Sequence, residues 1–167
     1  MAEETIIVPE SKVRFRGIFS FGDFYRFFID TFKTLGYTID EEKYRHKEKP
    51  EAQEVEVIWN CYKNIDDYTR FLIKARILVI DLRKVQVQKE GVTTTADSGE
   101  IEVTFTARLV TDYLDRWETS PFLKFVKGIY DRYLYKPTFE SYKKRIVDEM
   151  YTVENETKSF FNLARFM

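Results

Sequence analysis

The residue types that most often carry chemistry are sparse in this sequence. The only histidine is His46, in a charged segment, and the only cysteine is Cys61. We expect His46 to be a solvated loop residue, because nothing near it in the sequence would position its imidazole for proton transfer. Cys61 alternates with Val57 and Trp59, which predicts a buried thiol that packs as a small apolar side chain. One histidine and one cysteine cannot assemble a conventional structural zinc site.

Carboxylates are the remaining candidate ligands for a hard cation. Asp66 and Asp67 lie in a predicted turn, and Asp112 and Asp115 flank a predicted strand end, so both pairs suit ordinary structural positions. The glycines form neither a phosphate-binding loop nor a dinucleotide fingerprint. We therefore expect no catalytic site, metal or cofactor. An enzyme is the least supported class, although carboxylate and tyrosine chemistry needs neither histidine nor cysteine.

Aromatic side chains are the abundant feature, at 17% of the 167 residues, and Phe and Tyr supply nearly all of them. Lys and Arg number 27 and Asp and Glu number 28, which argues against a general attraction to nucleic acid or an anionic membrane. The single cysteine favours a reducing compartment. Without a secretory signal pattern or an apolar run of roughly 20 residues, we expect a cytoplasmic protein with no membrane span.

The first third of the chain contains one well-marked helix. Residues 1–11 are polar and include Pro9, which predicts a loose N-terminal arm, and the alternation over 12–19 predicts a strand. Ser20 and Asp23 form a variant of the capping box, and Gly36 suits a left-handed C-terminal cap. Apolar residues recur between them at helical spacing, so a helix is predicted over 20–36. Dense charge over 37–50 predicts a solvated loop or an edge strand.

A period of two dominates residues 54–117 and predicts an antiparallel sheet, with a bulge near Asp81. Ser120 followed by Pro121 is typical of a helix start, and two helices are predicted within 120–167. The expected architecture is a single α+β domain. It comprises an antiparallel β-meander of three to four strands, preceded by one amphipathic helix and followed by two helices packed on the sheet.

Three stretches carry a resemblance to a known group of proteins: Phe21-Gly22-Asp23-Phe24-Tyr25, Gly36-Tyr37 and Phe122-Leu123-Lys124-Phe125. With the order helix, three-strand meander, helix, helix, the chain resembles small uncharacterised archaeal α+β proteins of unknown function. The resemblance spans most of the chain. It implies an archaeal, cytoplasmic origin and no mechanism.

The surplus of aromatic rings leads to a first hypothesis, a non-catalytic binding or scaffolding module that acts through an aromatic-rich helical surface. Its partner would be another protein or a second copy of the chain. The candidate surface lies near the end of the sequence and comprises Phe160, Phe161, Phe166 and Met167.

Two alternatives remain open beside it. One is a carrier of a small apolar ligand, with a cavity between a curved sheet and the helices. Its candidate lining residues are Phe28, Phe32, Trp59, Phe105 and Phe125. The other is an RNA- or ribosome-associated protein that uses basic strand faces, with Arg14, Arg16, Lys74 and Arg76 as candidates. Nucleic acid is disfavoured because Glu54, Glu56 and Glu102 are expected to balance these cations.

Overall fold

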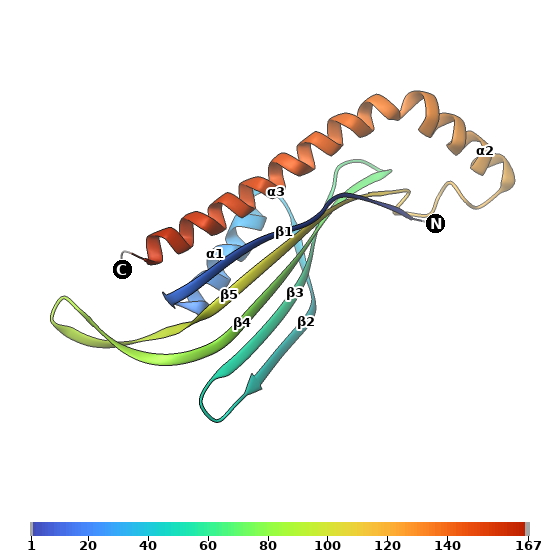
Figure 1. Cartoon of the computed structure of the whole chain (residues 1–167). Helices are drawn as coiled ribbons and strands as arrows, with labels where there is room; N and C mark the ends of the chain where they lie inside the picture. Colours follow the sequence, from blue (N-terminus) through green and yellow to red (C-terminus); the bar gives the residue numbers. More distant parts are fainter. Residues whose placement is uncertain (1, 166–167) are drawn as a thin grey trace.

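The computed structural model describes residues 2–165, which form an antiparallel sheet with helices packed on one face (Figure 1). The sheet order is β1-β5-β4-β3-β2, with β1 (Glu3–Phe19), β2 (Thr38–Glu48), β3 (Gln53–Asn64), β4 (Thr69–Lys89) and β5 (Val92–Thr111). The helices are α1 (Phe21–Thr34), α2 (Pro121–Ile129) and α3 (Lys136–Ala164), with a π-helical turn over Tyr130–Leu134. The α+β prediction is confirmed. The described sheet has five strands, however, whereas three to four were expected, and of the two later helices α3 packs on the sheet whereas α2 projects past its end.

Both edge strands come from segments that the sequence pattern left outside the predicted sheet. Residues 1–11 were expected to be a loose arm, but from Glu3 onward they belong to β1, which pairs with β5 from Thr111 to Asp97. The register shifts on either side of Val8, and this irregularity accommodates Pro9 on an edge strand. The charged segment after Gly36 forms the opposite edge, β2, as one of the two predicted alternatives. At its other end the sheet stops at Thr111, short of the predicted 117.

Helix α1 begins and ends where its local sequence predicts. The Ser20 hydroxyl accepts a hydrogen bond from the backbone N–H of Asp23 at 3.2 Å, and Gly36 has a φ of +86°. These two residues are caps rather than helical residues, so the helix is slightly shorter than the predicted range 20–36. The helices after 120 start as predicted at Ser120 and Pro121, and α3 starts at Lys136.

The core lies between α1, α3 and the face of the sheet that carries the odd-numbered residues of β3, β4 and β5. Phe24, Phe28 and Phe32 form one fully buried stripe on α1. The Phe28 ring centroid lies 5.6 Å from that of Trp59 and 5.9 Å from that of Phe105. These contacts fix α1 across the central strands, because aromatic rings of this size fill the helix–sheet space with few residues.

The β4–β5 hairpin extends beyond its neighbours in the sheet. Pairing with β1 stops at Asp97 and pairing with β3 stops at Leu82, so the end of the hairpin has only two strands. The predicted bulge is confirmed by a register shift between Ile80 and Arg83, where Asp81 has a φ of +53°. Gly99 faces this bulge, and a Cβ atom there would lie 3.0 Å from the Ile80 carbonyl oxygen and 3.2 Å from the Leu82 Cα. The bulge thus requires glycine opposite it.

Gly99→Ala is expected to destabilise the fold by about 2 kcal/mol, because backbone atoms of the bulge must move to admit the methyl group. Gly128→Ala is the matched control, since a Cβ there meets nothing within 4 Å and the residue lies inside α2. The control should raise the free energy of unfolding by roughly 0.5–1 kcal/mol. Urea unfolding of both variants checks the pair, and equal effects at the two positions would contradict the role of Gly99.

Candidate binding surfaces

A row of large apolar side chains faces solvent on α2 and the π-helical turn. Phe122, Phe125, Ile129 and Tyr133 recur at intervals of three or four residues, and Phe122 and Tyr133 are 71% and 69% exposed. Leu134 is exposed beside them. We call these five residues the α2 surface. Figure 1 shows that this part of the chain projects past the end of the sheet, so no strand lies against the row.

A buried ammonium group anchors the opposite side of α2. The Lys127 Nζ lies 3.1 Å from Glu3 Oε1, 3.6 Å from Glu118 Oε1 and 4.0 Å from Asp112 Oδ2. Burial alone would lower the pKa of Lys127, but the hydrogen bond and charge of Glu3, with Asp112, outweigh it and raise the pKa above its usual value. Lys127 therefore stays charged and ties α2 to the start of β1 and to the loop after β5.

Tyrosines form the second anchor. The Tyr68 hydroxyl donates to Asp131 at 2.6 Å, and the hydroxyls of Thr69 and Tyr135 lie 2.6 Å apart. Burial raises the pKa of Tyr135 to about 12, so it stays a neutral phenol. Tyr68 also packs edge-on against Tyr135, at a centroid distance of 5.2 Å. The helical segment is thus held by its inner side. Among the described residues, the α2 surface on its outer side is not needed for packing.

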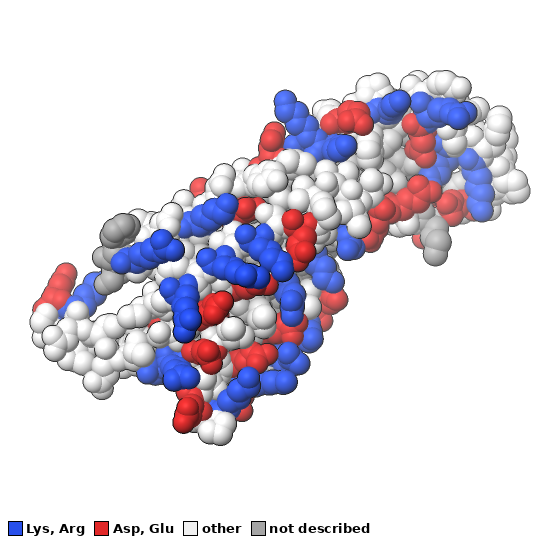
Figure 2. Space-filling view, viewed as in Figure 1, with Lys and Arg blue, Asp and Glu red and all other residues white. Residues whose placement is uncertain are grey.

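Three basic side chains lie beside the α2 surface. Lys124, Arg132 and Lys136 are exposed next to the apolar row, and the acidic group within this segment, Asp131, is engaged by Tyr68. Figure 2 shows both blue and red side chains among white ones at this end of the molecule. The surface therefore combines apolar anchors with three adjoining basic side chains, although the whole chain is nearly neutral.

The candidate surface at the end of the sequence is less exposed than the α2 surface. Phe161 is only 3% exposed, and its ring stacks on those of Phe15 and Phe24 at 4.9 and 5.0 Å. Phe160 is half-buried and stacks on Phe27 at 5.1 Å. Phe166 and Met167 lie outside the described residues. The exposed aromatic row is found on α2 instead, where the spacing in the sequence indicated a helix face but not its exposure.

The candidate cavity-lining residues separate into two groups. Phe28, Phe32, Trp59 and Phe105 are fully buried, and the Phe28 ring contacts the other three, with its centroid 5.2 Å from that of Phe32. Their rings fill the helix–sheet space at this point. Phe125 lies apart from them on the α2 surface and is 67% exposed.

The candidate basic residues lie on the uncovered face of the sheet, where acids accompany most of them. Arg14 Nε lies 2.6 Å from Glu102, Arg76 Nε lies 3.1 Å from Glu56, and Lys74 Nζ lies 2.9 Å from Glu42. Arg16 is opposite Glu100 in the strand register. Figure 2 shows blue and red side chains intermingled over the sheet. Such mixed pairing offers no continuous basic field to a nucleic acid backbone.

Other chemistry-bearing residues are engaged in ordinary contacts. The His46 Nε2 lies 3.2 Å from the Gln53 amide oxygen, where both side chains are exposed, and burial raises the pKa of the Cys61 thiol. Across residues 2–165, no group of three or more His, Cys, Asp and Glu side chains could hold a metal ion. Within the same range, none of the helices combines the length and apolar character needed to cross a bilayer.

Comparison with known sequences does not assign the chain to a family. A scan against protein-family models and a search of curated proteins each found no match to the chain. The resemblance to archaeal α+β proteins therefore stays a prediction.

Glu56→Gln tests the strongest ion-pair centre of the open face. The Glu56 side chain is 6% exposed and lies within 3.2 Å of Lys43, Arg45 and Arg76. Burial alone would raise its pKa, but the hydrogen bonds from Arg76 and Lys43 outweigh this and lower it. A lowered folded-state pKa means that the stabilisation is present above the usual carboxyl pKa and is lost as the pH falls through the folded value.

We expect Glu56→Gln to lower the free energy of unfolding by about 1–3 kcal/mol at neutral pH. The difference from the wild type should shrink as the pH falls below about 4.5, because the native carboxylate then also takes up a proton. Denaturant titrations at several pH values measure it, and a difference that is independent of pH would contradict the assignment.

Lys127→Met tests the anchor of α2. Removing the ammonium leaves buried Asp112 without that neighbour, so a loss of about 3 kcal/mol is expected. Amide hydrogen exchange should accelerate over 121–134 more than over β4 and β5, because the change loosens the docking of one element. Lys124→Met, at an exposed position of the same helix, is the control and should leave exchange unchanged.

Proposed function

We propose that the protein is a non-catalytic binding module that places its α2 surface in an apolar groove of a partner protein. The supporting observation is the exposure of Phe122, Phe125, Ile129 and Tyr133 on one side of an anchored helical segment. Their spacing of i, i+3, i+7 and i+11 matches the anchors by which helices occupy protein grooves. Aromatic side chains are also the residue type that contributes most where interfaces are fully desolvated.

The narrow shape of the row favours a protein groove over a lipid surface. The row follows a single line along the helix, with Lys124 and Gly128 on the adjoining exposed positions. Helices that lie in a membrane interface usually present a broad apolar face and a separate charged one, whereas a narrow stripe suits a helical or groove-shaped partner. The inner side of α2 is moreover fixed against the protein by Lys127, so the helix cannot roll to widen the contact.

The exposed basic residues beside the α2 surface favour an acidic partner over a second copy. In a two-fold symmetric contact the same patch faces itself, so Lys124, Arg132 and Lys136 would approach their own counterparts. Like charges at an interface are unfavourable, whereas acidic side chains around the partner's groove would complement them. The proposed partner is therefore a different protein, with an apolar groove bordered by Asp and Glu.

A binding assay with a purified candidate partner tests the proposal. Phe125→Glu should weaken binding at least 30-fold, because it places a charge at the centre of the row. Leu163→Glu is the matched control, since Leu163 is equally exposed, at 67%, but lies at the far end of α3. It should change the dissociation constant less than twofold. Lys124→Glu should slow association and reduce its dependence on salt.

Three outcomes would contradict this function. Equal binding by the Phe125→Glu variant would remove the α2 surface from the contact. A dimer in light scattering that Phe125→Glu dissociates would identify a second copy as the occupant. Flotation of the wild type, but not of Phe125→Glu, with vesicles containing phosphatidylserine would identify a lipid surface. Because Phe125 is exposed, the variant should keep the wild-type thermal midpoint within about 2 °C, which confirms that it folds.

A further inference from the structure

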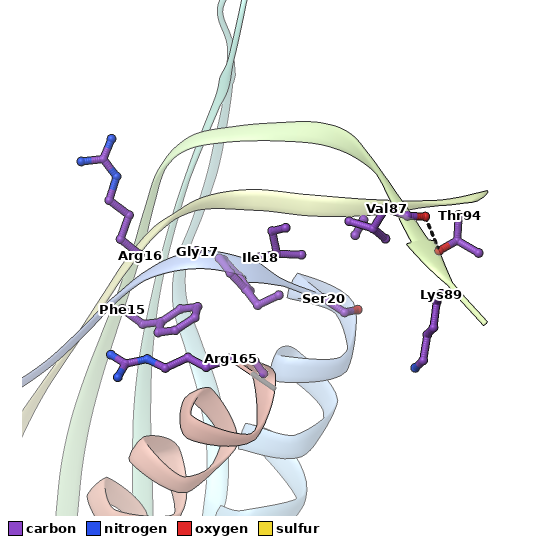
Figure 3. A pocket seen from close by; sticks show the side chains of 12 residues that line it. Phe15, Arg16, Gly17, Ile18, Ser20, Val87, Lys89, Thr94 and Arg165 are labelled. Atoms are coloured by element: carbon purple, nitrogen blue, oxygen red, sulfur yellow. Dashed lines mark hydrogen bonds between the residues drawn. The ribbon is translucent and has the colours of Figure 1, made fainter. Parts of the chain in front are cut away.

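A cleft of about 550 Å³ lies beneath the extended β4–β5 hairpin, at the opposite end of the molecule from α2. Figure 3 shows Phe15, Ser20 and Arg165 on one side and Val87, Thr94 and Lys89 of the hairpin on the other. The bend of the hairpin at the bulge after Ile80 separates the two sides. The volume is within the range of roughly 300–1,000 Å³ that small-molecule sites occupy.

The wall of the cleft is apolar. Ile18 and Val87 present apolar surface to the cleft, with Ala96 beside them, and the nearly buried Phe15 and Ala164 complete the apolar lining. Ile18 remains exposed although it is a large aliphatic side chain. Such a concave apolar wall at the end of a sheet is favourable for an aliphatic chain, because filling it removes apolar surface from water.

The charged residues of the cleft are all basic. They are Arg16, Lys89 and Arg165, and no Asp or Glu among the described residues lines it. None of the three forms an ion pair with another residue in the range 2–165, in contrast to Arg14, Lys74 and Arg76 on the open sheet face. Asp97, next to Ala96 in β5, is occupied by the Lys84 ammonium and the Phe21 backbone N–H. Lys89 and Arg165 therefore present positive charge without an ion pair beside the apolar wall, whereas Arg16 has Glu100 opposite it in the strand register.

We infer that this cleft binds a small single-chain amphiphile with a carboxylate head, that is, a free acyl carboxylate. The aliphatic chain lies along Ile18 and Val87, and the carboxylate meets Lys89. Burial of the chain against the apolar wall supplies most of the affinity for this ligand. The Lys89 ammonium favours an anionic head group over a neutral or cationic one. This site is independent of the α2 surface and of the function proposed for it.

Lys89 is assigned to the head group because Arg16 and Arg165 are both directed elsewhere. The Arg165 guanidinium lies 5.6 Å from the centre of the Phe15 ring, which it covers. Arg16 points away from Phe15, toward the other side of β1, in Figure 3. Lys89 extends from the hairpin on the side opposite Phe15, so a ligand that spans the cleft has its chain at one end and its head at the other.

Calorimetric titration of the full chain with decanoate, dodecanoate and tetradecanoate, each below its micelle concentration, tests the inference. We expect one molecule per chain, with affinity that rises about three- to fourfold for each added methylene until the cleft is full. Dodecylamine and 1-dodecanol have the same chain without the carboxylate, and both should bind at least tenfold more weakly than dodecanoate.

Two variants separate the apolar wall from the cation. Lys89→Gln should weaken dodecanoate about tenfold and leave 1-dodecanol unchanged, because only the head-group contact is lost. Ala96→Trp fills the cleft without changing charge and should abolish binding of both. Lys47→Gln on β2 is the control for Lys89, since it removes an exposed lysine from a different strand. Each variant is first compared with the wild type by thermal unfolding, and Val87→Phe replaces Ala96→Trp if the latter unfolds.

Any one of three results would overturn the site: no heat at 1 mM dodecanoate, equal affinity for dodecanoate and 1-dodecanol, or binding that survives both cleft-filling variants. If binding is lost equally in Lys47→Gln and Lys89→Gln, general charge rather than the cleft is responsible, and the inference fails. Because none of these variants touches the α2 surface, failure here leaves the proposed protein-binding function intact, and failure of that function leaves this result intact.

Discussion

Burial of the phenylalanine stripe of α1 against Trp59 and Phe105 is the constraint on which the rest of the structure depends. Because one face of the sheet is buried against this stripe, the opposite face is exposed to solvent and carries cross-strand ion pairs instead. It also fills the helix–sheet space with rings. A ligand site therefore has to lie at the margins, where the hairpin leaves the sheet or where a helix passes beyond its end.

Features governed by neighbouring residues could be predicted from the sequence. The Ser20 cap, the alternation around Trp59 and the bulge at Asp81 each depend on a few adjacent positions. The pairing of Glu3 with Thr111 depends on residues more than a hundred positions apart, so a polar segment with a proline gave no local indication of a strand. Edge strands are hard to recognise for the same reason: their pairing partner, rather than their own pattern, determines them.

The candidate surfaces show the same division between local and distant causes. Phe125 and Phe161 both occupy apolar faces of helices, and their sequence contexts do not distinguish them. Phe161 is buried because α3 runs beside β1 and α1, where Phe15 and Phe24 receive it. Phe125 is exposed because β5 has already ended and α2 is held from its other side, by Lys127 and the tyrosines. The exposure of Phe125 thus depends on where the sheet ends, and the helical spacing of apolar residues in the sequence does not indicate that position.

Helix α3 connects the two ends of the molecule, since Lys136 adjoins the α2 surface and Ala164 lines the cleft. A ligand could couple the ends only by shifting this helix along its axis. Midway, Glu149 accepts hydrogen bonds from Tyr37 at 2.6 Å and Lys63 at 2.8 Å, and Glu154 accepts one from Ser11 at 2.6 Å. A shift would break these partly buried bonds together, and neither end offers differential contacts to compensate for that cost. The fold thus favours two independent surfaces over an allosteric pair.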